Sequence, residues 1–86
     1  MIIITALGKE YEASWCGVSP YDSALRFYLK TTDIADVFST FTNPENTETI
    51  TFVQDDMGNE KTYENYTVFK GVNVSEEGIA VSLRRP

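Results

Sequence analysis

One stretch of this chain has the hydrophobic spacing of a helix, while most other apolar segments alternate as strands do. Four apolar side chains fall at positions i, i+3, i+4 and i+7, the spacing of one helical face: Ile34, Val37, Phe38 and Phe41. Thr32 or Asp33 can cap the N-terminus of this helix, and the residue before Pro44 avoids the helical region. We therefore predict a mainly β (α+β) chain with one short helix at about 32–42.

The alternating segments predict strands before and after that helix. Threonine, valine and isoleucine outnumber alanine and leucine, which favours strands over further helices. The expected strands are 2–7, 9–18, 23–30, 47–54, 60–74 and 79–84, in the order β-β-β-α-β-β-β. Short turns join most of them, so we expect an antiparallel twisted sheet or a small partly open barrel, plugged by the helix. At 86 residues, the chain is predicted to form a single domain, 1–86.

The largest apolar residues on the expected inward faces define a predicted core. It consists of Trp15, Leu25, Phe27, Phe38, Phe52 and Leu83. A helix of about ten residues is unstable alone in water, so it must pack on the sheet. In this prediction Phe38 and Phe41 make that contact.

The first expected strand is apolar on both faces and carries no charge or proline. Its run Ile2-Ile3-Ile4 would pair with another chain if it lay at a sheet edge. Alternatively the strand is central, flanked by the second strand and the last one. The sequence leaves both arrangements open, and the first predicts self-association or a protein partner.

Residue usage argues against catalysis and cofactor binding. The chain has no histidine, and Cys16 is its only cysteine, so it lacks the commonest general base and the means for a cysteine-based zinc site. The acidic pair Asp55 and Asp56 falls in an expected hairpin turn, where contact with water gives carboxylates none of the burial that acid–base catalysis requires. We predict no enzymatic activity, no cofactor and no metal.

Negative charge is concentrated in the middle of the chain. The net charge is −6, which argues against direct binding to nucleic acid. Segment 31–64 contains one basic residue and eight acidic ones: Asp33, Asp36, Glu45, Glu48, Asp55, Asp56, Glu60 and Glu64. We interpret them as solvated turns and a polar helix face, or as an acidic surface for a basic partner.

Tyrosine is common at protein interfaces because it brings area and a hydrogen bond at low entropy. Several tyrosines fall where we expect partial exposure. The predicted interaction surface combines them with the first strand and the acids: Ile2, Ile3, Ile4, Tyr28, Asp33, Asp36, Asp55, Asp56, Tyr63 and Tyr66.

The first residues lack the basic segment and long apolar run of a secretory signal. No later apolar run approaches the roughly 20 residues that a membrane span requires. We therefore expect a protein of the host cytoplasm or of a virion, without membrane contact.

Three stretches of the sequence are similar to stretches of known proteins: EYEASWCGV at 10–18, FTNPENTETI at 41–50 and YTVFKGV at 66–72. In them the chain resembles small proteins encoded in phages and prophages of Gram-positive bacteria, often near virion-assembly genes. The resemblance implies a virion or phage-accessory role and assigns no functional residue.

These observations predict a non-enzymatic protein-interaction or assembly module, a phage structural or accessory protein. The alternative is an acidic inhibitor that mimics the phosphate backbone and occupies the groove of a basic host protein. Salt distinguishes the two, because only the acidic mimic should lose affinity steeply as ionic strength rises.

Overall fold

The computed structural model describes residues 1–54 and 57–86, and it contains strands and two short helices. Asp55 and Asp56 lie outside the described residues, so the predictions that involve them stay predictions. The elements in chain order are β1 (Ile2–Thr5), β2 (Glu10–Val18), β3 (Leu25–Leu29), α1 (Ile34–Phe41), α2 (Pro44–Thr47), β4 (Thr49–Val53), β5 (Glu60–Glu64), β6 (Val68–Ser75) and β7 (Gly78–Arg84).

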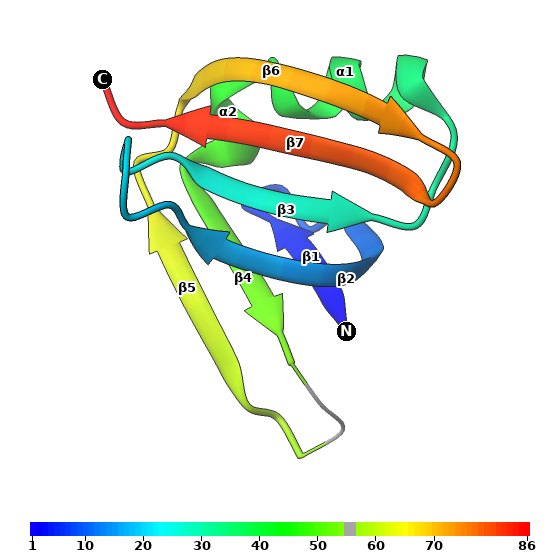
Figure 1. Cartoon of the computed structure of the whole chain (residues 1–86). Helices are drawn as coiled ribbons and strands as arrows, with labels where there is room; N and C mark the ends of the chain where they lie inside the picture. Colours follow the sequence, from blue (N-terminus) through cyan, green and yellow to red (C-terminus); the bar gives the residue numbers. More distant parts are fainter. Residues whose placement is uncertain (55–56) are drawn as a thin grey trace.

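The strands form one open antiparallel sheet in the order β5-β4-β1-β2-β3-β7-β6. The predicted mainly β class and antiparallel sheet are confirmed. In Figure 1, β4 and β5 run steeply across the direction of β3, β6 and β7, and α1 lies behind β6 and β7. Strand β2 belongs to both halves of the sheet, since it pairs with β1 along its first part and with β3 along the rest.

The first strand is central, which corrects the predicted edge at Ile2, Ile3 and Ile4. Ile3 lies opposite Tyr11 of β2 on one side and opposite Phe52 of β4 on the other. The neighbour of β1 is therefore β4 and not the last strand, as the alternative arrangement supposed. No backbone edge remains on β1 for a second chain.

The edges of the sheet are β5 and β6, which follow one another in the chain. The sequence predicted one long strand over 60–74, and the structure divides it at Asn65, whose φ of 67° ends the extended conformation. Both edges carry features that discourage pairing. Strand β5 is charged at Glu60, Lys61 and Glu64, and β6 changes register near the exposed Lys70.

The predicted helix is present, and a second one that was not predicted follows it directly. Asp33 caps α1 by accepting a hydrogen bond from the Asp36 amide, as its sequence position indicated. Pro44 stands in the first turn of α2, where its fixed φ suits a helix start, and the Asn43 side chain caps this helix. Thr47, expected at the start of a strand, is the buried last residue of α2.

The core lies between the inner face of the sheet and α1. Four predicted members, Leu25, Phe27, Phe52 and Leu83, are buried there. Two predictions are wrong: Trp15 and Phe38 are 46% and 52% exposed. The remaining core residues include Ile3, Tyr11, Ala13, Cys16, Leu29, Val37, Phe41, Ile50, Tyr63, Tyr66, Ile79 and Val81.

Candidate interaction surface

The outer face of strands β2, β3, β7 and β6 carries a row of side chains that point away from the core. Trp15 lies opposite Tyr28, Tyr28 opposite Ala80, and Ala80 opposite Asn73. We call these four residues the outer row. An irregularity in the β2–β3 pairing between Ala13 and Trp15 sets the row up, because it turns Trp15 outward and Cys16 inward.

Two aromatic rings form one end of the outer row. The Trp15 and Tyr28 ring centroids are 5.5 Å apart with planes inclined by 36°, and both side chains are about half exposed. Gly17 explains how the indole lies against the sheet, since a Cβ there would come within 2.7 Å of the Trp15 ring. The sequence Trp-Cys-Gly thus places an exposed, flat aromatic surface on β2.

Two shallow grooves flank the other end of the outer row. One, of about 210 Å³, is lined by Tyr28, Asn73, Ser75 and Glu77 among others. The second, of about 250 Å³, lies over Lys70, Gly71, Asn73, Ala80 and Ser82. The short side chains along β7 and β6 leave these grooves beside the half-exposed aromatic rings.

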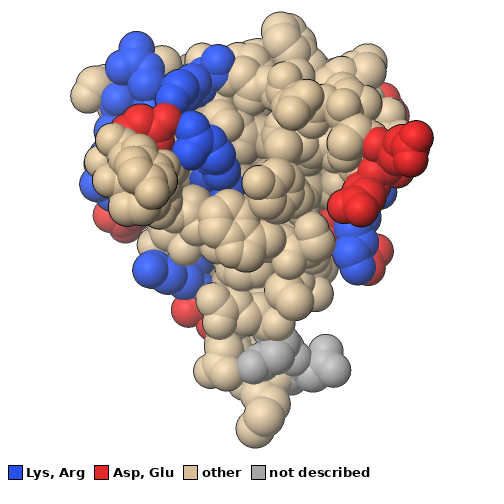
Figure 2. Space-filling view, viewed as in Figure 1, with Lys and Arg blue, Asp and Glu red and all other residues tan. Residues whose placement is uncertain are grey.

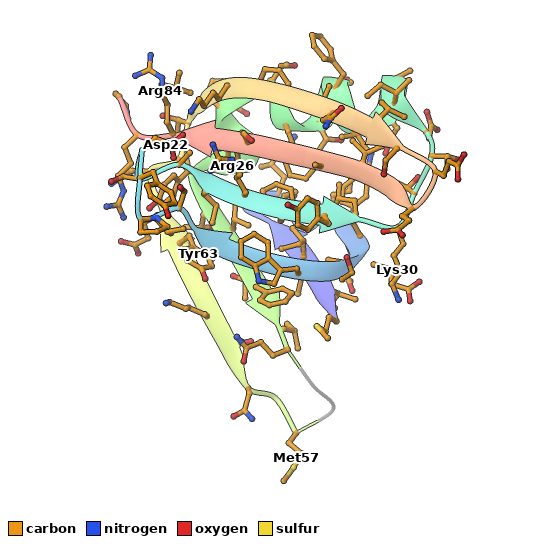
Figure 3. The ribbon with its side chains drawn as sticks, viewed as in Figure 1. Asp22, Arg26, Lys30, Met57, Tyr63 and Arg84 are labelled. Atoms are coloured by element: carbon orange, nitrogen blue, oxygen red, sulfur yellow. The ribbon has the colours of Figure 1, made fainter. Side chains whose placement is uncertain are left out.

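The middle of this face is uncharged, and charge lies toward its ends. Figure 2 shows most of the visible basic side chains at upper left, an acidic group at right and neutral surface between them. Figure 3 locates Asp22, Arg26 and Arg84 toward one end of these strands and Lys30 at the other. The face is therefore a neutral aromatic surface between a basic end and an acidic end.

Asp22 organises the basic end. Its carboxylate accepts hydrogen bonds from Lys70, from the Arg26 guanidinium and from the Ala24 amide. The ammonium of Lys70, followed by these other donors, holds the pKa of Asp22 well below its usual range. The carboxylate stays ionised and fixes both cations, so the end as a whole remains basic.

The structure places one predicted site residue, Tyr28, in the outer row, and it separates the others. Ile2 and Ile4 lie half-buried on the outer side of β1, opposite Glu12 and Glu10 of β2, while Ile3 is in the core. Tyr63 and Tyr66 are buried and contact each other edge to face, with centroids 6.3 Å apart. Their predicted exposure is wrong because β5 and the turn after it fold against the core.

Asp33 and Asp36 have structural partners. Asp33 is the α1 cap. Asp36 accepts a hydrogen bond of 2.6 Å from the Tyr11 hydroxyl and forms an ion pair with Lys9, so it joins α1 to β2. The Lys9 ammonium, then the Tyr11 hydroxyl, hold the pKa of Asp36 below its usual value, and Asp36 in turn raises the pKa of Lys9.

We expect Asp36→Asn to lower the melting temperature by a few degrees at neutral pH, because the partly exposed ion pair contributes no more than about 1 kcal/mol. The lowered pKa of Asp36 means that its stabilisation is present above the pKa of an unfolded aspartate and is lost as pH falls through the folded value. The raised pKa of Lys9 means that its own contribution is lost at the alkaline end, as pH rises through the folded value. Thermal melts against pH check this: the variant should show a smaller loss of stability than the wild type on acidification. Glu60→Gln, at an exposed position on the β5 edge, is the control and should leave the acid limb unchanged.

Cys16 is buried and unsuited to nucleophilic chemistry. Burial raises the pKa of its thiol to about 12, so the thiolate is scarce at neutral pH. Within residues 1–54 and 57–86, no group of three or more Cys, Asp or Glu side chains could hold a metal ion. Among the described residues, the outer row is therefore the best candidate for a functional site, and it offers a surface for binding and not for catalysis.

Trp15 was expected in the core, but the sequence of β2 contains a signal for its outward position. Uninterrupted alternation along β2 would place Gly17, which has no side chain, at an inward position and Cys16 outside. A one-residue shift exchanges them and gives the core the small hydrophobic thiol. The exposure of Trp15 follows from that shift.

No family model matches this chain, and neither does any curated protein or solved structure. Neither helix in the described part of the chain is long and apolar enough to cross a membrane.

Proposed function

We propose that this chain is a non-enzymatic interaction module that binds a protein through the outer face of β2, β3, β7 and β6. The single observation behind the proposal is the pair of rings, Trp15 and Tyr28, which lie side by side and half exposed on an uncharged part of the sheet. Tryptophan and tyrosine dominate binding energy at protein interfaces. Aromatic groups gathered on a solvent-facing sheet are typical of a contact surface.

The surroundings of the rings suit a protein partner. The grooves beside Tyr28 and Ala80 have room for single side chains, and their lining includes polar groups such as Asn73 and Glu77. A neutral centre with a charged periphery is the usual anatomy of a protein–protein interface. The first-strand contact expected from the sequence is replaced in this proposal by a contact through the sheet face.

The acidic inhibitor is a second candidate, and the described acids give it less support. Asp33 and Asp36 lie at the start of α1, Glu45 and Glu48 at α2, and Glu60 and Glu64 on the β5 edge. A phosphate mimic needs free carboxylates spaced along one surface, whereas Asp36 is engaged by Lys9 and Tyr11.

The resemblance of segments 10–18, 41–50 and 66–72 to phage and prophage proteins supports a more specific proposal, a phage structural or accessory role. An assembly component must present a binding surface on a small stable domain, and the outer row meets that need. The identity of the neighbouring genes is the observation that tests this part of the proposal.

Site-specific crosslinking tests the proposed function. We expect a photo-reactive phenylalanine analogue at position 28 to crosslink to a protein in the cells that naturally express the chain. Tyr21 is the matched control, because it is also a tyrosine but lies in the β2–β3 loop at 97% exposure. The same analogue at position 21 should give little or no crosslinked product.

Added salt then separates the two candidates. Contact through neutral aromatic rings should persist at about 0.5 M salt, at which the Debye length falls to about 4 Å, whereas an acidic mimic should release its partner. Crosslinking at position 21 equal to that at position 28, or no protein product at position 28, would refute binding through the outer face.

A further inference from the structure

The outer face has opposite charges at the two ends of β7, on either side of the outer row. Arg84 lies four residues after Ala80 on β7, about 13 Å away in an extended strand, and Glu76 and Glu77 lie just before Gly78, the first residue of β7. Arg84 points outward, because it follows the buried Leu83. Glu76 and Glu77 form the exposed turn between β6 and β7.

These three charged side chains are not compensated within the molecule. In the part of the chain that the structure describes, Arg84, Glu76 and Glu77 have no ion-pair partner, whereas Arg26 is paired with Asp22 and Lys30 with Glu12. The uncompensated charge is therefore positive at one end of the outer face and negative at the other. A complementary partner must present the reverse order along the same line.

A second copy of the chain presents the charges in this reverse order when it is rotated about a two-fold axis. The axis lies in the interface and runs perpendicular to the strands. This rotation brings the outer row of one copy against that of the other and exchanges the two ends. Arg84 of each copy then lies over the Glu76–Glu77 turn of its partner. A two-fold axis along the strands would instead place like charges on each other, so the charges select one arrangement.

We propose that the chain forms a symmetric homodimer through its outer faces, with the outer rows at the centre and reciprocal Arg84 contacts to Glu76 and Glu77. The dimer rests on the binding role proposed above for the same face. In it, Arg26 and Lys30 approach each other, but each brings its own carboxylate, so Asp22 and Glu12 complete an alternating set of charges. This axis sets each strand opposite the same strand of the other copy, so the Trp15 and Tyr28 rings of one copy lie over the same two rings of its partner.

The size of the face sets the expected affinity. Four strands at about 4.8 Å spacing and seven residues at about 3.3 Å rise give roughly 19 by 23 Å, or roughly 440 Å² of projected area. A standard interface buries about 800 Å² on each partner, so this contact is at the small end. We expect a dissociation constant of roughly 10–100 µM, a weak and reversible dimer.

Charge reversal tests the arrangement. Arg84→Glu and the double variant Glu76→Lys/Glu77→Lys change exposed side chains, and both proteins should fold as the wild type does. In sedimentation equilibrium at low salt, each should associate about tenfold more weakly, because both symmetric contacts become repulsive. An equimolar mixture of the two should recover the wild-type affinity, because every contact between the two different variants joins opposite charges.

Recovery on mixing is specific to the reciprocal arrangement. Tyr28→Ala should weaken association about thirtyfold and Tyr21→Ala should leave it unchanged.

A wild type that is monomeric up to about 1 mM would overturn the dimer. Association that persists in Tyr28→Ala and in both charge-reversed variants would also overturn it, because that behaviour indicates pairing at the β6 edge. Lost association that mixing does not restore would also overturn it. Crosslinking from position 28 to a different protein, with a monomeric wild type, would refute the dimer and leave the proposed function standing.

Discussion

Replacement of Ile3 by lysine should unfold the protein. Ile3 has no exposed surface and lies in the middle of the sheet, between Tyr11 on β2 and Phe52 on β4. The substitution loses the burial of an isoleucine side chain, about 2–3 kcal/mol, and places an ammonium group where it has no anion and no path to water. A domain of this size has roughly 5–10 kcal/mol in total, so the folded state is lost. Amide dispersion in a proton–nitrogen NMR spectrum measures the result directly.

Ile4→Lys is the matched control, since it makes the same change on the next residue of the same strand. Ile4 is half-buried on the outer side of β1, where it lies opposite Glu10 and Thr51. A lysine there reaches water and gains a cross-strand glutamate, so we expect a change within about 1 kcal/mol. A folded, monomeric Ile3→Lys protein with native dispersion would contradict the central position of β1.

The central position of β1 could not be predicted from the sequence, although the hairpin turns could. The sequence correctly predicted short turns between neighbouring strands, because a hairpin is a local structure with a local signal. The turn between β1 and β2 is one of them, and Gly8 in it has a φ of 89°. The pairings of β1 with β4 and of β3 with β7 join distant segments. They depend on how the whole sheet closes around α1, and no residue near Ile3 encodes that choice.

The interaction surface was only partly predictable for a different reason. Alternation assigns a face to each strand residue, and one irregularity reverses the assignment for the rest of the strand. That reversal in β2 moved Trp15 from the expected core to the outer row. Tyr28 needed no correction, because β3 is regular throughout.

Removal of the Phe41 side chain should destabilise the protein far more than removal of Phe38, three residues earlier on the same helix. Phe41 is 1% exposed, and its ring contacts Phe27 at 5.0 Å and Tyr11 at 5.4 Å between centroids. Phe41→Ala leaves a cavity between α1 and the sheet, at a cost of about 3–5 kcal/mol. Urea denaturation should show a midpoint lowered by half or more.

Phe38→Ala is the control that separates helix docking from helix formation. Both variants make the same change in helix propensity, but Phe38 is about half exposed and has one described aromatic contact, an edge-to-face contact with Phe69 at 5.4 Å. We expect it to cost about 1–2 kcal/mol. Two turns of helix present only a narrow face to the sheet, and residues three apart differ by about 60° around the axis. Val37 and Phe41, four apart, share the buried side, which leaves Phe38 at its margin. Equal losses for the two variants would mean that α1 is rotated toward the docking that the hydrophobic spacing alone predicted.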